Sequence, residues 1–362
     1  MDEIRKIWLH NPKMPLENYN KLFEGKQIEA VILGNDINKI HRAVDEGLRT
    51  FVCLHSFSAK PHFDNEEYLC RDIEGNSHIW FGSPCPNKAP VLERFISNIE
   101  KAASIDGVEG VFLDGCRFAS PCSSEKAEAF LTCFCSDCCK KSEDLGFDMD
   151  IIKRDVKELY NLITGTDSNI AVEIKYIRSR EDLYCVLPGL KEWIDFRTAC
   201  VNGFLELARD TVKRCSEDKK LCMYSFFPAI SPAVGQRYAE MREYVDIFSP
   251  MLYRRYDRPS GPACMDHEIS RLVKLLSGNP YISPTEAIQI VQAITGLSLE
   301  GFNNAEDIKQ GLKTVHVYEE AKRVIDEVDG RKVVPIIMAD DPDIPGHFYQ
   351  FSKLGLDTVN LF

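Results

Sequence analysis

The stretch Gly110-Val-Phe-Leu-Asp-Gly-Cys-Arg117 has the form of one buried strand that ends in a polar turn. A short apolar run bounded by turn residues is typical of a strand in a parallel sheet. In such folds the polar residue that ends the strand, here Asp114, stands at the edge where functional side chains collect. The segment is therefore both a structural and a functional starting point.

The same pattern recurs along the chain and alternates with amphipathic stretches, which is typical of βα units around a parallel sheet. One such stretch, Trp193–Cys215, places apolar residues on one helical face. Eight strands alternating with helices predict an α/β fold, namely a closed (β/α)8 TIM barrel. The predicted strands are Ile4–His10, Ala30–Gly34, Thr50–Phe57, Gly110–Phe118, Leu221–Pro228, Asp246–Arg255, Val333–Asp340 and Asp357–Phe362.

A ninth apolar segment, Ile170–Ile177, competes for a place in the sheet. Its isoleucines at 170, 174 and 177 follow helical spacing, and Thr166-Asp-Ser-Asn169 offers N-cap side chains before it. We expect a helix there, which leaves eight strands.

The chain has no internal repeat and no Gly/Ser/Pro-rich linker, so we expect residues 1–362 to form a single barrel. Two connections exceed ordinary βα loops: Ser58–Ala89 after the third strand, and the cysteine-bearing excursion 119–190 after the fourth. Long ordered loops on this side of a barrel build the active face.

The composition excludes several classes of protein. The 362 residues carry 44 Lys and Arg against 56 Asp and Glu, a net charge of −12, so the overall field repels nucleic acid. We find neither an apolar signal-peptide region near Met1 nor an apolar run of 18 residues, so we expect no membrane partner and a cytoplasmic location.

Fourteen cysteines are many for this length, and several stand in the cluster Cys133-Phe-Cys-Ser-Asp-Cys-Cys139. A C-x-C-x-x-C turn can direct three sulfurs at one tetrahedral metal ion. In a cytoplasmic protein, reduced thiols without metal, or a redox pair, are the alternatives. A fourth ligand must come from elsewhere, and Cys116, Cys122 and Cys139 are candidates.

Cys85-Pro86-Asn87, followed by the clustered cysteines, resembles the zinc cluster of family 42 glycoside hydrolases, the β-galactosidase-like barrels. That resemblance implies a structural zinc ion held by Cys85, Cys133, Cys135 and Cys138. Beyond this region the chain resembles uncharacterised glycoside-hydrolase-like barrels in three short patterns: Trp193–Arg197, Val234–Gln236 and Ser249–Tyr253.

The resemblance also implies a pair of catalytic carboxylates. Asp114 coincides with the acid/base position of the family on the fourth strand, and Asp340 or Asp341 with the nucleophile position after the seventh. The family has Asn-Glu where this chain has Leu113-Asp114. The structural alternatives are an Asp114–Arg117 ion pair that orders the loop, and turn capping by the acids before Pro342.

Other side chains at strand ends are expected to contact substrate, because sugars present both apolar faces and hydroxyl groups. These predicted substrate-binding residues are His10, His55, Arg117, Phe227, Tyr253 and Arg255.

The leading hypothesis is thus a glycoside-hydrolase-like enzyme that acts on a small saccharide or glycoside through two strand-end carboxylates. Two alternatives stay open. One is a non-catalytic barrel that binds a saccharide at the same face, and the other is a zinc-dependent lyase or isomerase in which the cysteine cluster is catalytic.

Overall fold

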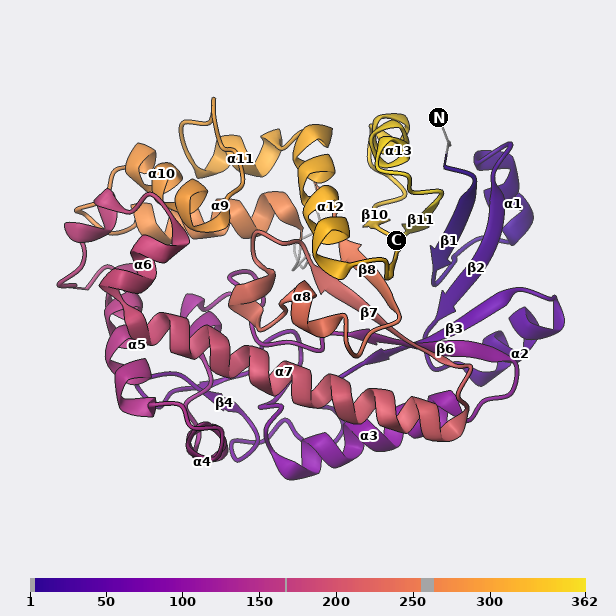
Figure 1. The fold of residues 1–362 in the computed structure, drawn as a ribbon, viewed down its shortest axis with the longest axis horizontal. Coiled ribbons are helices and arrows are strands. Elements are labelled where there is room, and N and C mark those ends of the chain that lie inside the picture. The colour runs from indigo at the N-terminus through magenta and orange to yellow at the C-terminus, as the bar shows by residue number, and fades with distance from the viewer. Residues whose placement is uncertain (1–3, 167, 255–263) are drawn as a thin grey trace.

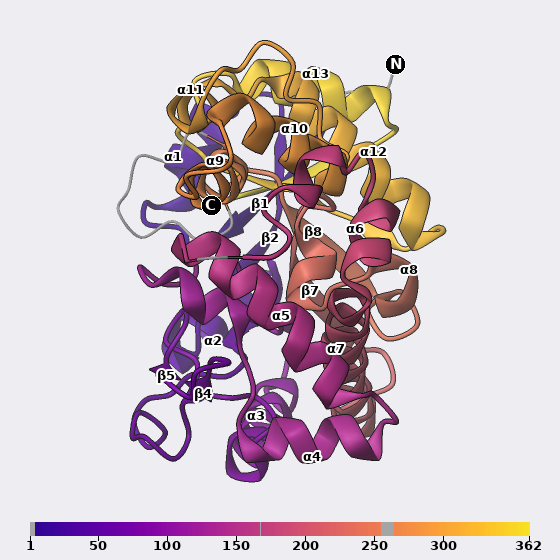
Figure 2. The same cartoon turned by 90° about the vertical axis from the view of Figure 1, so that its left-hand side faces the viewer.

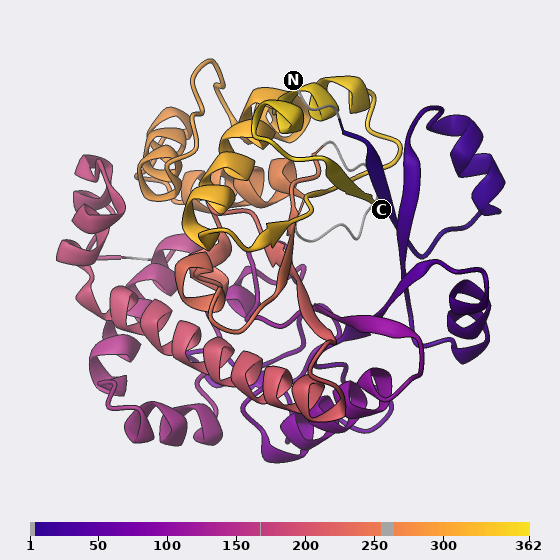
Figure 3. The same ribbon diagram turned by 45° about the vertical axis from the view of Figure 1, so that its right-hand side comes forward.

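The computed structural model describes residues 4–166, 168–254 and 264–362, and within them a ring of parallel strands surrounded by helices (Figures 1 and 3). The sheet has the order β10-β11-β1-β2-β3-β6-β7-β8-β9, and an additional β10–β8 pairing closes it. Every pairing in it is parallel. The predicted (β/α)8 barrel is confirmed. Its strands are β1 (Lys6–His10), β2 (Gln27–Leu33), β3 (Arg49–His55), β6 (Val108–Asp114), β7 (Lys220–Phe226), β8 (Ile247–Met251), β9 (Lys332–Val333), β10 (Ile336–Ile337) and β11 (Thr358–Leu361).

The seventh strand position is occupied by two short strands, β9 and β10, on either side of Val334-Pro335. Pro335 has no backbone N–H to donate to a ladder, which accounts for the interruption. The break does not open the barrel, because β8 pairs with both halves: Phe248 stands opposite Val333 and Met251 opposite Ile336.

Thirteen α-helices lie in the described part of the chain, most of them on the outside of the barrel (Figure 1). The predicted helix Trp193–Cys215 is confirmed as part of α7. The helices are α1 (Leu16–Leu22), α2 (Ile37–Asp45), α3 (Ala89–Ala103), α4 (Ser136–Asp144), α5 (Met149–Thr164), α6 (Arg180–Val186), α7 (Pro188–Cys215), α8 (Tyr238–Met241), α9 (Met265–Ser277), α10 (Pro284–Thr295), α11 (Ala305–Gly311), α12 (Thr314–Val328) and α13 (Ile344–Lys353).

The two long connections are ordered. The one after β3 carries a small antiparallel hairpin, β4 (Cys70–Arg71) with β5 (Ser77–His78), which the sequence analysis did not anticipate. The excursion after β6 contains α4, α5 and α6, seen on one side of the molecule in Figure 2. Its segment Ile170–Ile177 forms no strand; a single turn of 3-10 helix, Glu173–Tyr176, stands where we expected a helix.

Aromatic rings fill the interior of the ring of strands. Trp8 of β1 stacks on Phe51 of β3 at 5.1 Å between centroids, and Phe112 of β6 lies 5.0 Å from Tyr224 of β7. Trp8 also meets Phe112 edge-on at 6.3 Å, across two intervening strands. The barrel therefore has a packed centre, as this fold requires, so the interior of the ring of strands leaves no room for a ligand. No helix in the described ranges is long and apolar enough to span a bilayer.

The close approach of β6 to β7 gives a test of the register. A Cβ atom on Gly110 would lie 2.2 Å from the carbonyl oxygen of Lys220 on the paired strand. We expect Gly110→Ala to lower the free energy of unfolding by about 2–3 kcal/mol, because backbone atoms cannot yield as a side chain can. Urea unfolding measures the change.

Gly203→Ala is the matched control, since Gly203 lies inside α7 and a Cβ there meets nothing within 4 Å. Alanine should stabilise that helix by roughly 0.5–1 kcal/mol. Equal effects at the two positions would contradict the β6–β7 packing.

Candidate functional site

Asp114 ends β6 at the carboxyl end of the barrel, opposite His55 of β3 in the register of the sheet. Its side chain is only partly exposed, and burial raises the pKa of this carboxyl group to about 6, although Arg117 and the Gly115 N–H oppose the shift. The described residues supply no side-chain hydrogen bond to it. Asp114 is thus a carboxyl group that holds its proton at mildly acidic pH and faces the mouth of the barrel.

The wall beside Asp114 comes from the loop after the β4–β5 hairpin. Gly115 has a positive φ of 71°, and a Cβ atom on it would lie 3.3 Å from both the His55 and Phe81 rings. Those two rings pack edge-to-face at 4.9 Å, and His55 Nε2 lies 3.2 Å from the Ser83 hydroxyl. Burial lowers the pKa of His55 to about 4, so its imidazole is neutral at pH 7.

His10 of β1 lies within the same end of the barrel. Its Nδ1 is 2.7 Å from the Tyr224 hydroxyl of β7, and burial lowers its pKa to about 4. The buried Asn360 reaches the same hydroxyl from β11 at 3.4 Å. Phe362 packs against His10 at 4.9 Å and stacks with Tyr253 at 6.3 Å. Side chains on β1, β7 and β11, together with Phe362 and Tyr253, thus form one polar and aromatic cluster.

Tyr253 connects this cluster with Asp114. Burial raises the pKa of its hydroxyl group well above the usual range, and the negative charge of Asp114 adds to that shift. Asp114 has the same effect on Tyr224. The structure therefore brings four predicted site residues, His10, His55, Asp114 and Tyr253, to one end of the barrel.

Arg117 does not form the ion pair that we considered. Its Nη1 donates to the Phe118 carbonyl oxygen at 2.7 Å and to the Ser123 hydroxyl at 3.0 Å, and no ion pair within 4.0 Å joins it to Asp114 in the described chain. The guanidinium lies over the rings of Trp80 and Phe226, at 5.2 and 4.5 Å. It is almost fully buried and supports the wall of the mouth from behind.

Phe227 and Arg255 are the remaining predicted substrate contacts. Phe227 is fully buried, so it presents no surface to a ligand in this conformation. Arg255 lies outside the described residues.

The two acids after the seventh strand have different surroundings. Asp341 is buried and pairs with Arg254 at 3.4 Å and with His347 at 3.1 Å. It also accepts a hydrogen bond from the Asp343 N–H at 2.8 Å, which is the turn-capping arrangement considered above. Burial opposes the change, but the His347 hydrogen bond and the other partners hold the pKa of Asp341 below its usual value. Asp340 is exposed and, within the described ranges, forms no ion pair.

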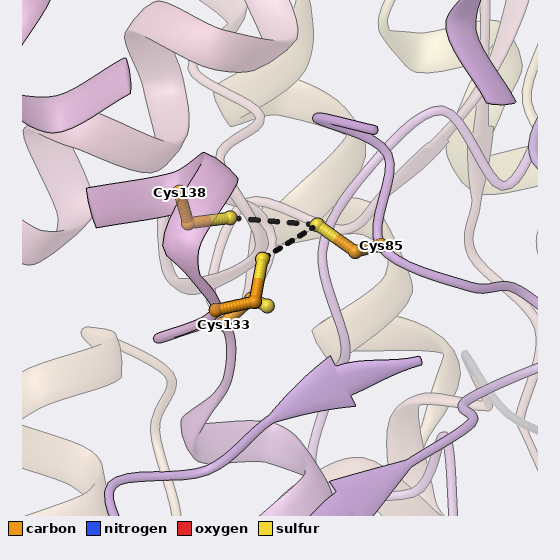
Figure 4. A group of neighbouring side chains, drawn as sticks. Cys85, Cys133 and Cys138 are labelled. Atoms are coloured by element: carbon orange, nitrogen blue, oxygen red, sulfur yellow. Dashed lines mark hydrogen bonds between the residues drawn. The ribbon is translucent and has the colours of Figure 1, made fainter. Parts of the chain in front are cut away.

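The four predicted metal ligands come together. The sulfurs of Cys85, Cys133, Cys135 and Cys138 all lie within 4.8 Å of one another and all four residues are buried, so this group could hold a metal ion such as zinc. Figure 4 shows the labelled side chains of Cys85, Cys133 and Cys138 converging from two segments. Cys85 Sγ is 3.5 Å from Cys138 Sγ and 3.6 Å from Cys135 Sγ.

Polar groups around the sulfurs fit a thiolate cluster. The Arg71 N–H donates to Cys133 Sγ at 3.3 Å, and the Asn87 side chain donates to Cys138 Sγ at 3.3 Å. The Arg197 guanidinium is fully buried and interacts electrostatically with Cys133 and Cys138. Donors and positive charge of this kind stabilise the negative charge of metal-bound thiolates.

A fifth thiol lies beside these four and was not predicted from the sequence. Cys70, on the β4–β5 hairpin, is fully buried and contacts Cys85 and Cys133. It stands outside the group of four, as do the rival ligands that we considered. Of these, Cys122 Sγ donates to the His267 carbonyl oxygen and Cys139 Sγ to that of Phe134.

Substitution of Asp114 should remove the folding free energy that burial of its negative charge costs. The folded-state pKa near 6 exceeds the unfolded value near 4, so the folded protein binds more protons between these values, and its stability falls as pH rises through that window. We expect Asp114→Asn to raise the free energy of unfolding by about 1–2 kcal/mol above pH 6 and by nothing below about pH 4. Urea titrations at several pH values measure this.

Asp45→Asn serves as the control, because Asp45 is exposed at the end of α2, at the opposite end of the barrel. It should unfold like the wild type at every pH. A variant at Asp114 that is less stable than wild type at pH 8 would contradict the buried charge.

No protein-family model matches this sequence, and no curated protein matches it significantly. Solved structures do match. The PgaB (BpsB) glycoside hydrolase domain from Bordetella bronchiseptica aligns with a TM-score of 0.55 at 12% identity, over 100% of this chain and 94% of that one. A catalytic mutant of Gan42B, a GH42 β-galactosidase from G. stearothermophilus, aligns with a TM-score of 0.54 at 11% identity.

The alignment with Gan42B covers all of this chain but 51% of the longer enzyme. Identities this low establish the shared fold alone. The chain is therefore a TIM barrel structurally similar to glycoside hydrolases, with a buried four-cysteine group, as its sequence predicted.

Proposed function

We propose that this protein is a carbohydrate-active enzyme of the glycoside hydrolase type, with Asp114 as its proton donor. The observation that carries the proposal is the raised pKa of a carboxyl group at the mouth of the barrel. Glycoside hydrolysis needs one carboxylic acid that is still protonated when the leaving oxygen departs. A pKa near 6 meets that requirement at mildly acidic pH.

The second carboxylate in this proposal is Asp340, with Asp341 as the alternative. Both follow the seventh strand, whose carboxyl end shares a rim with that of β6. Asp340 is exposed and thus accessible to a sugar or a water molecule, whereas the charge of Asp341 is already satisfied by Arg254 and His347. A separation of about 5–5.5 Å between the two carboxyl groups implies retention, and about 6.5–9.5 Å inversion.

The surrounding groups fit a small saccharide or glycoside. The partly exposed rings of Phe81 and Tyr253 offer apolar faces, and the neutral imidazoles of His10 and His55 can each donate or accept a hydrogen bond to a hydroxyl group. Arg117 would position the loop, and Arg255 and Phe227 stay predictions for substrate contact. The proposed location is the cytoplasm, where fourteen free cysteines stay reduced.

Zinc is the proposed metal of the four-cysteine group, in a structural role. Four thiolates complete a tetrahedral coordination and leave no open position for substrate or water. This geometry disfavours the lyase or isomerase alternative. A bound ion would hold together the hairpin loop, through Cys85, and the start of α4, through Cys138.

A non-catalytic saccharide-binding barrel is the second candidate. It is favoured by the Leu113-Asp114 pair, which replaces the Asn-Glu of the resembled family, and by the internal ion pairs of Asp341.

Hydrolysis of a panel of aryl and natural glycosides tests the first proposal. With any substrate that is hydrolysed, we expect Asp114→Asn to lower kcat by about 10²–10⁴-fold, because the proton donor is lost. The loss should be smaller for dinitrophenyl glycosides, whose leaving group needs no proton. Wild-type activity should also fall above about pH 6, as Asp114 loses its proton.

The exposed Asp45→Asn variant should keep full activity. Activity that survives Asp114→Asn unchanged would refute the assignment. Saccharide binding without hydrolysis, retained in both variants, would instead establish the non-catalytic barrel.

Metal content tests the zinc proposal. We expect about one zinc ion per chain in protein purified without added metal, and loss of most of it in Cys138→Ser, because three remaining thiolates bind more weakly. Elemental analysis measures the metal, and circular dichroism should show that the barrel stays folded. Cys185→Ser, at an exposed thiol on α6, should retain the ion. Absence of metal from wild-type protein kept reduced would rule out this role.

A further inference from the structure

An apolar cavity of about 120 Å³ lies outside the barrel, between α5, α6, α7, α9 and α10. These helices share one side of the molecule in Figures 1 and 2. The cavity has mainly aliphatic walls, which include Leu183, Ile230, Leu272, Leu276, Ile290 and Ile294. Such a space deprives the surrounding side chains of packing contacts, and an apolar ligand that fills it would restore them.

The lining offers little to an ordered water molecule, which needs two to four polar partners. The hydroxyl of Thr295, one of the few polar groups in the wall, already donates to the Val291 carbonyl oxygen at 2.6 Å. The interior therefore favours a hydrocarbon group.

Arg180, at the start of α6, adds a charge to this apolar wall. Its Nε donates to the Ile294 carbonyl oxygen at 2.9 Å, which fixes the guanidinium beside the cavity. Its two Nη atoms take part in no hydrogen bond or ion pair within the described residues. Glu327 interacts with it electrostatically, but beyond ion-pair distance. A fixed guanidinium with two free NH2 groups is a typical carboxylate receptor.

We propose that this cavity is a binding site for a small monocarboxylate with an apolar body, either a phenyl ring or a chain of about four to six carbon atoms. The body fills the space between the helices, and the carboxylate binds the Nη atoms of Arg180. The volume is of the same order as that of a protein cavity of roughly 150 Å³ that accepts a benzene molecule.

The site is separate from the barrel mouth, but its walls belong to segments that support the mouth. Ala229–Ala233 follows β7, and the Ala233 carbonyl oxygen accepts a hydrogen bond from Arg197 beside the cysteines. On α9, Glu268 accepts a hydrogen bond at 2.6 Å from Ser120, in the loop after Asp114. A bound ligand would therefore stabilise the mouth from outside, whether or not the protein hydrolyses glycosides.

Calorimetric titration with hexanoate and hexan-1-ol, which differ in charge but not in chain, tests the site. We expect wild-type protein to bind hexanoate with a Kd on the order of 1 mM and hexan-1-ol about tenfold more weakly. Arg180→Met should weaken hexanoate binding about tenfold and leave hexan-1-ol unchanged. Arg178→Met, at an exposed arginine two residues away, is the matched control and should bind both like wild type.

A second variant tests the cavity itself. Ala233→Leu extends a wall side chain into the space and should abolish binding of both compounds in protein whose folding is verified by circular dichroism. No hexanoate binding to the wild type at about 10 mM, equal affinity for the acid and the alcohol, or undiminished binding to folded Ala233→Leu would each overturn the proposal.

Discussion

The pairing of β8 with both halves of the interrupted seventh strand closes the ring on which every other feature depends. If Pro335 ended the ladder completely, β8 and β11 would become open edges with unpaired N–H and C=O groups. Instead, Phe248 pairs with Val333 before the break and Met251 with Ile336 after it. Closure places all strand ends of one polarity on a single rim. Residues hundreds of positions apart, such as His10 and Tyr253, therefore meet there through Phe362.

The cysteine cluster extends this constraint to the loops. Cys85 comes from the loop after β3 and the other three thiols from the excursion after β6, so the cluster joins the two longest connections at the rim. Phe81 and Ser83, which pack against His55, lie directly before Cys85. A metal ion at these sulfurs would therefore fix the wall beside Asp114.

Much of the barrel could be predicted because each strand is a short apolar run that ends in a turn signal, and such patterns are local. All eight predicted strands correspond to strands of the sheet. The two-residue strands β4 and β5 were missed since hairpins this short carry no periodicity. The break at Pro335 was not predicted, because the whole of Val333–Asp340 was expected to form one strand. Whether β8 pairs with both halves depends on the fold and cannot be read from the local pattern.

The candidate site was less predictable, because its chemistry depends on contacts between distant segments. The C-x-C-x-x-C spacing and Cys85 pointed to the four buried thiols, while Cys70 lacked any such motif and was overlooked. Likewise, the sequence placed Asp340 and Asp341 side by side as equals. Only the fold shows that Arg254 and His347 lie against the second of them and not against the first.

The environment of the mouth determines which group can transfer a proton there. His10 and His55 have pKa values near 4, so both imidazoles are neutral at pH 7 and cannot serve there as imidazolium proton donors. The same burial that lowers the pKa of the histidines raises the pKa of Asp114 to about 6, because a carboxyl group is neutral when it is protonated. Between about pH 4 and pH 6, one desolvated environment thus holds neutral imidazoles beside a protonated carboxyl group. Among these three groups of the mouth, that leaves Asp114 as the side chain whose proton is available at mildly acidic pH.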